Sequence, residues 1–285
     1  KKIAYLESIL ASEKKVLELI KEDLLDLKKK YGDERRTEIV PAEDELEIED
    51  LIADEGALIT ITHRGYIKRV PVTTYRSQRR GGKGVAGMAT RDEDFVEHLF
   101  TASTHDYLLF FTEAGQVHWL KVYQVPPASR IAKGRAITNL LQISNDENIA
   151  ALIKVRDFDP DHYVMLASAK GIVKKTSLED FSRPRQGGII AAGVKKGDRV
   201  IGATLTNGSD ELLLVTSGGK GIRFKETDVR PMGRTAACVK GIKVGKGDIV
   251  VGMQKVEPDH TLLVVSEKGY GKRTAFDQYN VQKRG

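Results

Sequence analysis

Seven consecutive residues combine the side chains and the backbone freedom that phosphate binding requires. The run Gln78-Arg79-Arg80-Gly81-Gly82-Lys83-Gly84 carries three cations within five residues. Its glycines let the main chain approach a phosphate closely and leave amide N–H groups open as further donors. Contacts of this kind hold a nucleic-acid backbone without reading the base sequence. The run therefore predicts a polyanion-binding loop, and a basic surface loop with no dedicated partner is the alternative.

A second group of cations recurs at a fixed distance from a repeated glycine. Four residues after each of five glycines stand Arg69, Trp119, Lys175, Arg223 and Arg273, of which four are basic. A single exposed charge would mean little, but the same charge on equivalent positions of stacked units would line one edge of the stack. We therefore expect a basic stripe along the array of repeats.

These glycines end a hairpin motif of four strand residues, a Ser or Thr, two turn residues and Gly. The hydroxyl is expected to close the turn through the backbone, and the glycine to supply the left-handed conformation of a hairpin turn. The intervals between the glycines are 50, 56, 48 and 50 residues, in the range of propeller blades. The five copies end at Gly65, Gly115, Gly171, Gly219 and Gly269.

Another strand is expected between successive hairpins, which gives about four strands per unit. These strands fall near residues 95–102, 149–155, 200–205 and 249–256. The fold class is therefore mainly β, a propeller-like array of repeated four-stranded blades. Five units are present, and the fifth is incomplete where the sequence stops at Gly285.

The first 38 residues follow a different period. Apolar residues alternate at spacings of three and four, as in the core positions of a coiled coil, and Gly32 is well placed to end the helix. One narrow apolar stripe needs a partner, so we expect half of an antiparallel coiled coil whose other half lies upstream of Lys1. Residues 39–50 then form an acidic linker. The stripe consists of Ile3, Leu6, Leu10, Leu17, Ile20, Leu24, Leu27 and Tyr31.

Charge is divided unevenly along the chain. Residues 1–57 hold 10 Lys and Arg against 17 Asp and Glu, whereas the remaining 228 residues hold 36 against 23. An acidic lead before a basic body indicates a polyanion-binding domain joined to another element.

Cations in every repeat are expected on the same rim. Each one alone is more typical of a solvated surface, but together they could neutralise a tightly bent duplex, whose bending energy many phosphate contacts must offset. They are Lys68, Arg69, Lys121, Arg130, Lys133, Arg135, Lys174, Lys175, Arg183, Arg185, Lys220, Arg223, Lys225, Arg234, Lys272, Arg273, Lys283 and Arg284.

Several functional classes find no support in the sequence. No apolar run approaches the roughly 20 residues of a membrane span, and the lone Cys238 excludes a disulfide framework or a cysteine zinc site. The six histidines lack the pairing of metal ligands, and residues 241–247 lack the spacer and the final Lys-Ser/Thr of a P-loop. We predict packing roles for Cys238 and Trp119. No catalytic residue, metal ligand or cofactor site is predicted.

Residues 78–84 are identical at all seven positions to the box that distinguishes the A subunits of bacterial DNA gyrase from topoisomerase IV. Residues 31–39 resemble the end of the coiled-coil arm in that family, and residues 269–274 resemble a later turn of its C-terminal domain. The similarity covers essentially the whole chain. It implies that residues 1–38 are the C-terminal helix of that arm and that residues 51–285 are a β-pinwheel, whose blades exchange strands and whose basic perimeter wraps DNA.

The resemblance also implies a function. DNA wrapped without sequence specificity would let an ATP-dependent type IIA topoisomerase, an isomerase, introduce negative supercoils. The partners would be double-stranded DNA, the gyrase B subunits and a second copy of the A subunit, in an A2B2 heterotetramer located in the cytoplasm with the nucleoid and not on a membrane. The cleavage tyrosine would lie upstream of Lys1, and ATP and Mg²⁺ would bind elsewhere in the holoenzyme. The family usually has six blades.

Two alternatives stay open. The first is the corresponding domain of topoisomerase IV, against which the heptapeptide argues. The second is a propeller that acts as a protein-interaction scaffold, which would favour an acidic or apolar rim over repeated cations.

Overall fold

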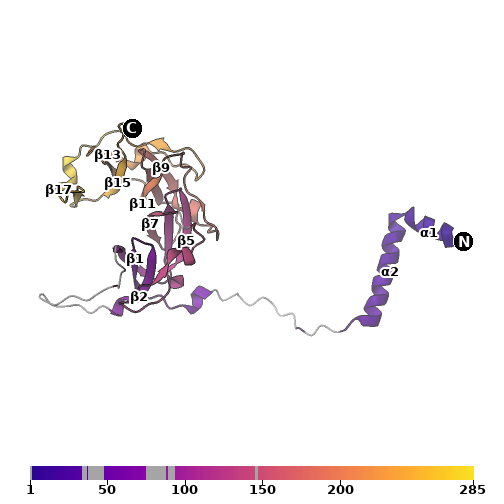
Figure 1. Ribbon diagram of the computed structural model, residues 1–285. Helices are drawn as coiled ribbons and strands as arrows, with labels where there is room; N and C mark the ends of the chain where they lie inside the picture. The colour runs from indigo at the N-terminus through magenta and orange to yellow at the C-terminus, as the bar shows by residue number, and fades with distance from the viewer. Residues whose placement is uncertain (1, 34–36, 38–47, 75–87, 89–93, 145–146) are drawn as a thin grey trace. The chain divides into compact units, whose positions relative to one another are not determined.

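The computed structural model describes residues 2–33, 37, 48–74, 88, 94–144 and 147–285. The chain divides into two units, residues 1–47 and 48–285, which are described separately. The heptapeptide 78–84 lies outside the described residues. Figure 1 shows the helices of the first unit and the successive sheets of the second.

The predicted single helix is wrong, because the first unit contains two helices. Helix α1 spans Lys2–Leu10 and α2 spans Glu13–Tyr31. Between them Ser12 has an extended backbone, with φ −140° and ψ 107°, as is usual for the residue that precedes a helix. Glu13 then places a carboxylate at the positive end of the α2 dipole. A serine therefore interrupts the heptad pattern where the apolar spacing alone indicated continuity.

The end of the second helix agrees with the prediction. The Gly32 N–H donates to the Lys28 carbonyl at 2.8 Å and closes α2, with φ at −69° rather than in the left-handed region. Neither α1 nor α2 has a buried side chain. Leu10 and Leu24 of the apolar stripe, for example, are 82% and 60% exposed. The described residues of this unit thus leave the apolar stripe uncovered, and its coiled-coil partner stays a prediction. None of the helices in the described part of the chain combines the length and the apolarity of a membrane span.

The second unit is built from antiparallel hairpins joined by 3₁₀ turns. A 3₁₀ turn at Ile48–Leu51 (η1) opens it. The hairpins are β1–β2 (Gly56–Thr62, Tyr66–Pro71), β4–β5 (Tyr107–Thr112, Gln116–Lys121), β8–β9 (Tyr163–Ser168, Ile172–Ser177), β12–β13 (Glu211–Thr216, Gly221–Lys225) and β16–β17 (Thr261–Val265, Gly271–Ala275). After them come η2 (Val72–Thr74), η3 (Val122–Gln124), η5 (Leu178–Phe181), η6 (Glu226–Asp228) and η7 (Phe276–Gln278).

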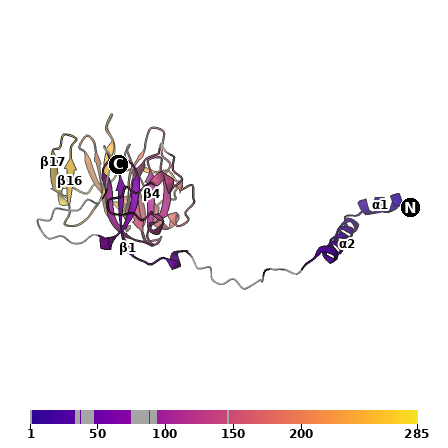
Figure 2. The same ribbon diagram turned by 60° about the horizontal axis from the view of Figure 1, so that its bottom comes forward.

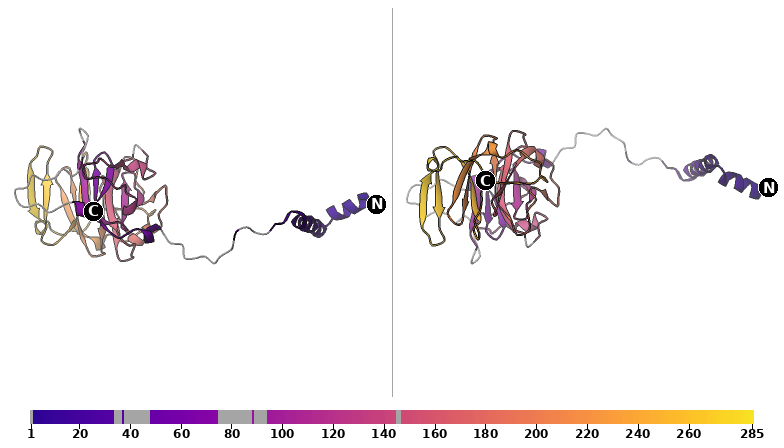
Figure 3. Two further views of the ribbon diagram at one scale, coloured as in Figure 1. Left: turned by 90° about the horizontal axis from the view of Figure 1, so that it is seen from below. Right: turned by 90° about the horizontal axis from the view of Figure 1, so that it is seen from above.

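The strands expected between the hairpins are also present. They are β3 (Val96–Ser103), β7 (Ile149–Val155), β11 (Val200–Thr206) and β15 (Val250–Val256). Each pairs antiparallel with the first strand of the preceding hairpin. Strand β11 packs against both β7 and β15, so these strands follow one another along the inner side of the array. Figure 2 and Figure 3 show the sheets side by side from other directions.

Hydroxyl groups close the hairpin turns as the sequence predicted. The amide of Gln116 donates to the Thr112 hydroxyl at 3.1 Å, and the amide of Ile172 donates to the Ser168 hydroxyl at 3.3 Å. The turn glycines are left-handed, with φ of 84° at Gly115 and 78° at Gly171, where a Cβ would be strained. The local chemistry of the motif is confirmed.

Each of three sheets is completed by a short strand from the following repeat. Strands β6 (Arg135–Ala136), β10 (Ile189–Ile190) and β14 (Val239–Lys240) lie beyond the next hairpin in sequence but pair with β2, β5 and β9. The sheet orders are β3-β1-β2-β6, β10-β5-β4-β7 and β11-β8-β9-β14, here called blades 1, 2 and 3. Blade 4 is β13-β12-β15 and blade 5 is β16-β17. We call residues 126–136, 182–190 and 230–240 the exchange segments. The strand exchange that the family resemblance implied is therefore present.

The core consists of layers between successive blades. Because side chains alternate along a strand, Leu108 and Phe110 of β4 pack toward blade 1, whereas Leu109 and Phe111 pack toward blade 3. Strand β8 contributes in the same way to the layers on either side, and β12 contributes Leu212 and Leu214 to the layer between blades 3 and 4. A strand buried on both faces reads as a continuous apolar run, which explains the unbroken Leu and Phe residues of these hairpins.

Aspartates that stand two residues before an inner strand cap the hairpin turns. The Asp248 carboxylate accepts hydrogen bonds from the Ser217 hydroxyl (2.7 Å) and from the amides of Gly218 (2.7 Å) and Ile249 (3.0 Å). Asp198 acts similarly in the preceding blade, where it accepts hydrogen bonds from the Ser168 hydroxyl and from the amides of Lys170 and Arg199. These hydrogen bonds favour the ionised carboxylate and lower the pKa of Asp248 from 3.8 to about 2.

This cap predicts an acid-sensitive contribution to stability. The pKa of Asp248 is lower in the folded chain than in the unfolded chain. Its carboxylate therefore stabilises the fold fully above pH 3.8, and this contribution is lost as the pH falls toward about 2. Asp248→Asn should lower the free energy of unfolding at neutral pH, and the difference from the parent should shrink across that window. Urea unfolding at several pH values measures it. Asp277→Asn removes an exposed carboxylate as the control, and a pH-independent difference for Asp248→Asn would contradict the assignment.

Candidate nucleic-acid interface

Three of the lysines expected on the rim are buried. Lys68 is 0% exposed, Lys174 is 1% exposed and Lys175 is 4% exposed. A buried ammonium group cannot reach a phosphate outside the fold, so the prediction that these three residues contact DNA is wrong. Their contacts show why the fold retains them.

Lys68 and Lys174 bind the main chain of the exchange segments. The ammonium of Lys68 donates to the carbonyl oxygens of Arg130 and Ala132, the latter at 2.9 Å. The ammonium of Lys174 donates to those of Arg234 and Ala236, the latter at 3.1 Å. Burial lowers the pKa of both lysines because it disfavours the charged form. Each lysine thus holds a segment of the following repeat against its own blade.

Lys175 belongs to a buried ion pair. Its ammonium lies 2.8 Å from the Glu226 carboxylate, which is 0% exposed, and 4.0 Å from the centre of the Tyr163 ring. The same carboxylate accepts a hydrogen bond from the Thr206 hydroxyl at 2.7 Å. The pair joins β9 of blade 3 to η6, the turn that follows the hairpin of blade 4.

Side chains four residues after the hairpin glycines have a common role as hydrogen-bond donors, although they do not all carry a charge. Arg69 donates to the Val125 carbonyl (3.2 Å), Trp119 to the Phe181 carbonyl (3.0 Å) and Arg223 to the Phe276 carbonyl (2.7 Å). Each acceptor lies at the 3₁₀ turn of the next repeat. Trp119 is therefore no exception, and its predicted packing role is confirmed. The prediction of an exposed basic stripe at this position is wrong. Arg69, Lys175 and Arg223 bind the neighbouring repeat, and of the five residues at this position only Arg273 is exposed.

The Lys121 side chain also has partners inside the fold. Its ammonium lies 2.7 Å from the Glu49 carboxylate of η1, donates to the His105 carbonyl at 3.0 Å and covers the Tyr107 ring at 3.8 Å. With a side chain only 12% exposed, Lys121 fastens η1 to blade 2.

The remaining predicted cations form the candidate interface. Over the described residues, none of them makes a salt bridge, whereas Lys121, Lys175 and Arg223 do. They stand on the exchange segments, next to or at the end of β13, within β17 and after η7, and none of them lies on the inner strands β7, β11 and β15. Three of them also make internal contacts: Arg284 donates to the carbonyls of Asp228 (2.7 Å) and Lys240 (3.0 Å), Arg234 donates to the Ile190 carbonyl (3.3 Å), and Lys133 lies over the Tyr66 ring (4.6 Å). The exposed ones are Arg135, Arg183, Arg185, Lys220, Lys225, Lys272, Arg273 and Lys283; the half-buried ones are Arg130, Lys133, Arg234 and Arg284.

One recurring arginine emerges only when the exchange segments are compared. Fifteen residues after the five hairpin glycines stand Arg80, Arg130, Gln186, Arg234 and Arg284. Arg130 and Arg234 lie in the exchange segments that Lys68 and Lys174 hold. The heptapeptide occupies the same chain position through Arg80, although its structure is outside the described residues. The sequence already contained this recurring arginine, as a constant spacing of fifteen residues from the hairpin glycine.

The buried ion pair generates a stability prediction. Removing one partner of such a pair leaves an uncompensated charge and costs about 3–5 kcal/mol. Lys175→Met should therefore lower the free energy of unfolding by about this amount, whereas Lys225→Met, an exposed change in the next blade, should alter it by less than about 0.5 kcal/mol. Denaturant unfolding measures both. Equal effects of the two substitutions would show that Lys175 is not a structural cation.

Comparison with known proteins agrees with the geometry. The family model "DNA gyrase C-terminal domain, beta-propeller" matches residues 57–103, 106–156, 162–207, 210–257 and 260–285. The DNA gyrase A subunit of Staphylococcus epidermidis is 48% identical over 99% of this chain, which spans 32% of that protein. The chain therefore corresponds to about a third of the length of the curated relatives it matches.

Two solved structures resemble the fold. The C-terminal domain of DNA topoisomerase IV has a TM-score of 0.70 and 30% identity, over 82% of this chain and 72% of that one. The DNA gyrase A C-terminal domain has a TM-score of 0.65 and 28% identity, over 81% and 75%. The fold is thus common to both kinds of topoisomerase, while the matching family model and the relative at 48% identity are both named for DNA gyrase. This chain belongs to the DNA gyrase A C-terminal domain family.

Proposed function

We propose that the chain binds double-stranded DNA along the outer edges of its blades and wraps it. The observation that carries the proposal is the division of the cations. Some are consumed by buried pairs and carbonyl contacts, and the exposed remainder has no carboxylate partner over the described residues. Cations left without an internal partner are available to replace the counterions of a polyanion.

The placement of these cations supports wrapping rather than a single point of contact. Exchange strands β6, β10 and β14 each lie at the edge of a sheet opposite the inner strand. Arg135 lies in one exchange segment and Arg183 and Arg185 lie in the next; the third carries the half-buried Arg234, whose guanidinium also donates to the Ile190 carbonyl at 3.3 Å. A duplex that follows successive blades meets a new group of cations at each one, and these contacts offset the energy of bending.

The wider role follows from family membership and is part of the proposal. Within a DNA gyrase A2B2 heterotetramer, the wrapped segment is presented to the cleavage gate so that ATP-dependent strand passage introduces negative supercoils. This chain contributes DNA binding and no catalytic residue. Cleavage and ATP hydrolysis take place in other parts of the enzyme, in the cytoplasm on nucleoid DNA.

The topoisomerase IV domain is the main alternative, since its fold is at least as similar as that of the gyrase domain. The heptapeptide at residues 78–84 and the 48% identity to a gyrase A protein favour the gyrase assignment. A protein-interaction scaffold would be expected to pair its rim charges or replace them with apolar side chains, which the exposed Arg183 and Arg185 do not support.

The first test is the salt dependence of DNA affinity. Arg183→Gln with Arg185→Gln removes two exposed cations of one exchange segment, so the slope of log affinity against log salt should become shallower by about 2. Lys154→Gln with Lys255→Gln removes the same charge from inner strands β7 and β15 and should leave the slope unchanged. Fluorescence anisotropy with a mixed-sequence duplex measures both. Equal slopes for the two double variants would count against an outer-edge path.

The second test concerns the heptapeptide. Replacing Arg79, Arg80, Gly81, Gly82 and Lys83 with Ala in the reconstituted enzyme should abolish supercoiling and spare relaxation, because wrapping is lost while cleavage and strand passage remain. Plasmid assays with and without ATP separate the two activities. Retained supercoiling in this variant would rule out an essential role for the box in wrapping.

A further inference from the structure

Two exchange segments contain the same tight turn. The amide of Ala132 donates to the Ser129 carbonyl at 3.1 Å, and the amide of Ala236 donates to the Gly233 carbonyl at 2.9 Å. In both turns the carbonyls of the arginine and of the alanine point to a buried lysine of the preceding blade, Lys68 or Lys174. The turns have the sequences Ser-Arg-Ile-Ala and Gly-Arg-Thr-Ala.

Those carbonyl contacts fix the direction of the neighbouring amides. In a trans peptide the C=O group and the following N–H group point in opposite directions. Because the carbonyls face a buried ammonium, the amides that follow them face away from it. No intramolecular acceptor for these amides is found among the described residues. They belong to Ile131, Lys133, Thr235 and Ala237, of which all but the half-buried Lys133 are exposed.

The buried lysine is not required to fill space. In blade 4 the equivalent position is Ile222, which is buried against the core. Burying an ammonium instead of an apolar side chain is unfavourable unless its donors are satisfied. Over the described residues Lys174 forms no ion pair, and the partners it does have are the carbonyls of Arg234 and Ala236. This arrangement is explained by control of the main chain rather than by packing.

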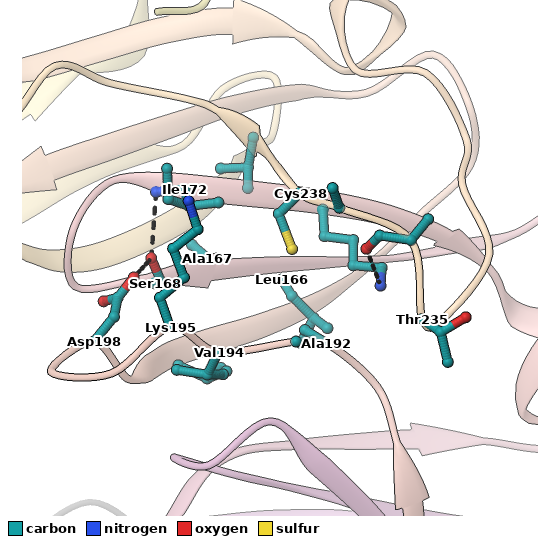
Figure 4. Close-up of a pocket in the computed structure, with 16 residues that line it drawn as sticks. Leu166, Ala167, Ser168, Ile172, Ala192, Val194, Lys195, Asp198, Thr235 and Cys238 are labelled. Carbon is teal, nitrogen blue, oxygen red and sulfur yellow. Dashed lines mark hydrogen bonds between the residues drawn. The ribbon is translucent and has the colours of Figure 1, made fainter.

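A cavity beside the turn supports the same conclusion. A volume of about 320 Å³ lies between β8–β9, residues 192–198 and residues 235–238, and Lys174 is part of its lining. Figure 4 shows Thr235 at one end of this lining, apart from the hydrogen-bonded Ser168 and Asp198. Since side chains do not fill the space behind the exchange segment, hydrogen bonds from Lys174 contribute directly to its position.

We propose that the two turns are seats for DNA backbone phosphates, each formed by two outward amides and one arginine. The seats consist of Ile131, Lys133 and Arg130 in one exchange segment, and of Thr235, Ala237 and Arg234 in the other. Lys68 and Lys174 are positioning residues, which orient the amides and add positive charge behind them without touching DNA. This inference rests on the proposed DNA binding and assigns the atoms that perform it.

Nuclear magnetic resonance of the ¹⁵N-labelled chain tests the seats directly. On titration with a short mixed-sequence duplex, the amide resonances of Ile131, Lys133, Thr235 and Ala237 should move downfield together and saturate with the overall binding curve. If other amides respond and these four do not, the seats are wrong while DNA binding stands. If no resonance responds to the duplex, both the seats and the proposed function fail.

Two substitutions separate positioning from contact. Thr235→Pro removes an outward donor at an exposed site without a change in charge, and it should weaken DNA binding roughly tenfold; Thr235→Ala retains the amide and should bind as the parent does. Lys174→Met should weaken binding by a similar factor even though the lysine is buried. Its salt slope should become shallower by about 1, because one phosphate contact is lost.

Controls keep the result independent of folding. Thermal unfolding identifies temperatures at which each variant is fully folded, and affinities are compared there. Parent-like affinity and salt slope for both Thr235→Pro and folded Lys174→Met would overturn the proposal. If Lys174→Met does not fold, parent-like binding by Thr235→Pro overturns the seat in its exchange segment on its own.

Discussion

The architecture depends on one unmet requirement for backbone hydrogen bonds. The second strand of each hairpin presents an edge that its own repeat does not cover, and exposed edges of this kind invite uncontrolled pairing. In blades 1 to 3 the main chain of the following repeat supplies the missing pairs, through β6, β10 and β14. Each of these blades is therefore complete only with its successor in place.

The requirement determines how the cations are used. A two-residue strand contributes few hydrogen bonds, so side chains reinforce it. Lys68 and Lys174 hold carbonyls of the exchange segments, and the position after them holds the next 3₁₀ turn through Arg69, Lys175 or Arg223. The cations divide into an inner set that maintains the exchange and an outer set whose exposed members have no carboxylate partner among the described residues. The inner set lies mainly on the second strands of the hairpins and holds the exchange segments that carry much of the outer set, which couples blade assembly to the binding surface.

The sequence predicted most of what is locally encoded. Hairpins, their hydroxyl-closed turns and the inner strands depend on residues near one another in the chain, and all agree with the structure. The interruption at Ser12 was missed because apolar spacing carries no information about a single capping residue. The two-residue strands β6, β10 and β14 were too short to have a periodicity. Lys174 and Lys175 were misassigned because charge alone does not distinguish an exposed lysine from one whose partner, Arg234 or Glu226, lies in the following repeat.

A constant spacing relates the heptapeptide to this scheme. Arg80 stands fifteen residues after Gly65, as Arg130 and Arg234 stand after Gly115 and Gly219. Where those turns continue with Ile-Ala and Thr-Ala, the heptapeptide continues with Gly81 and Gly82. Glycine presents its amide with no side chain to limit the approach of a phosphate. In sequence, the heptapeptide therefore occupies the position of the proposed phosphate-binding turns and carries glycines where those turns carry side chains, so one physical argument accounts for its glycines and its arginines.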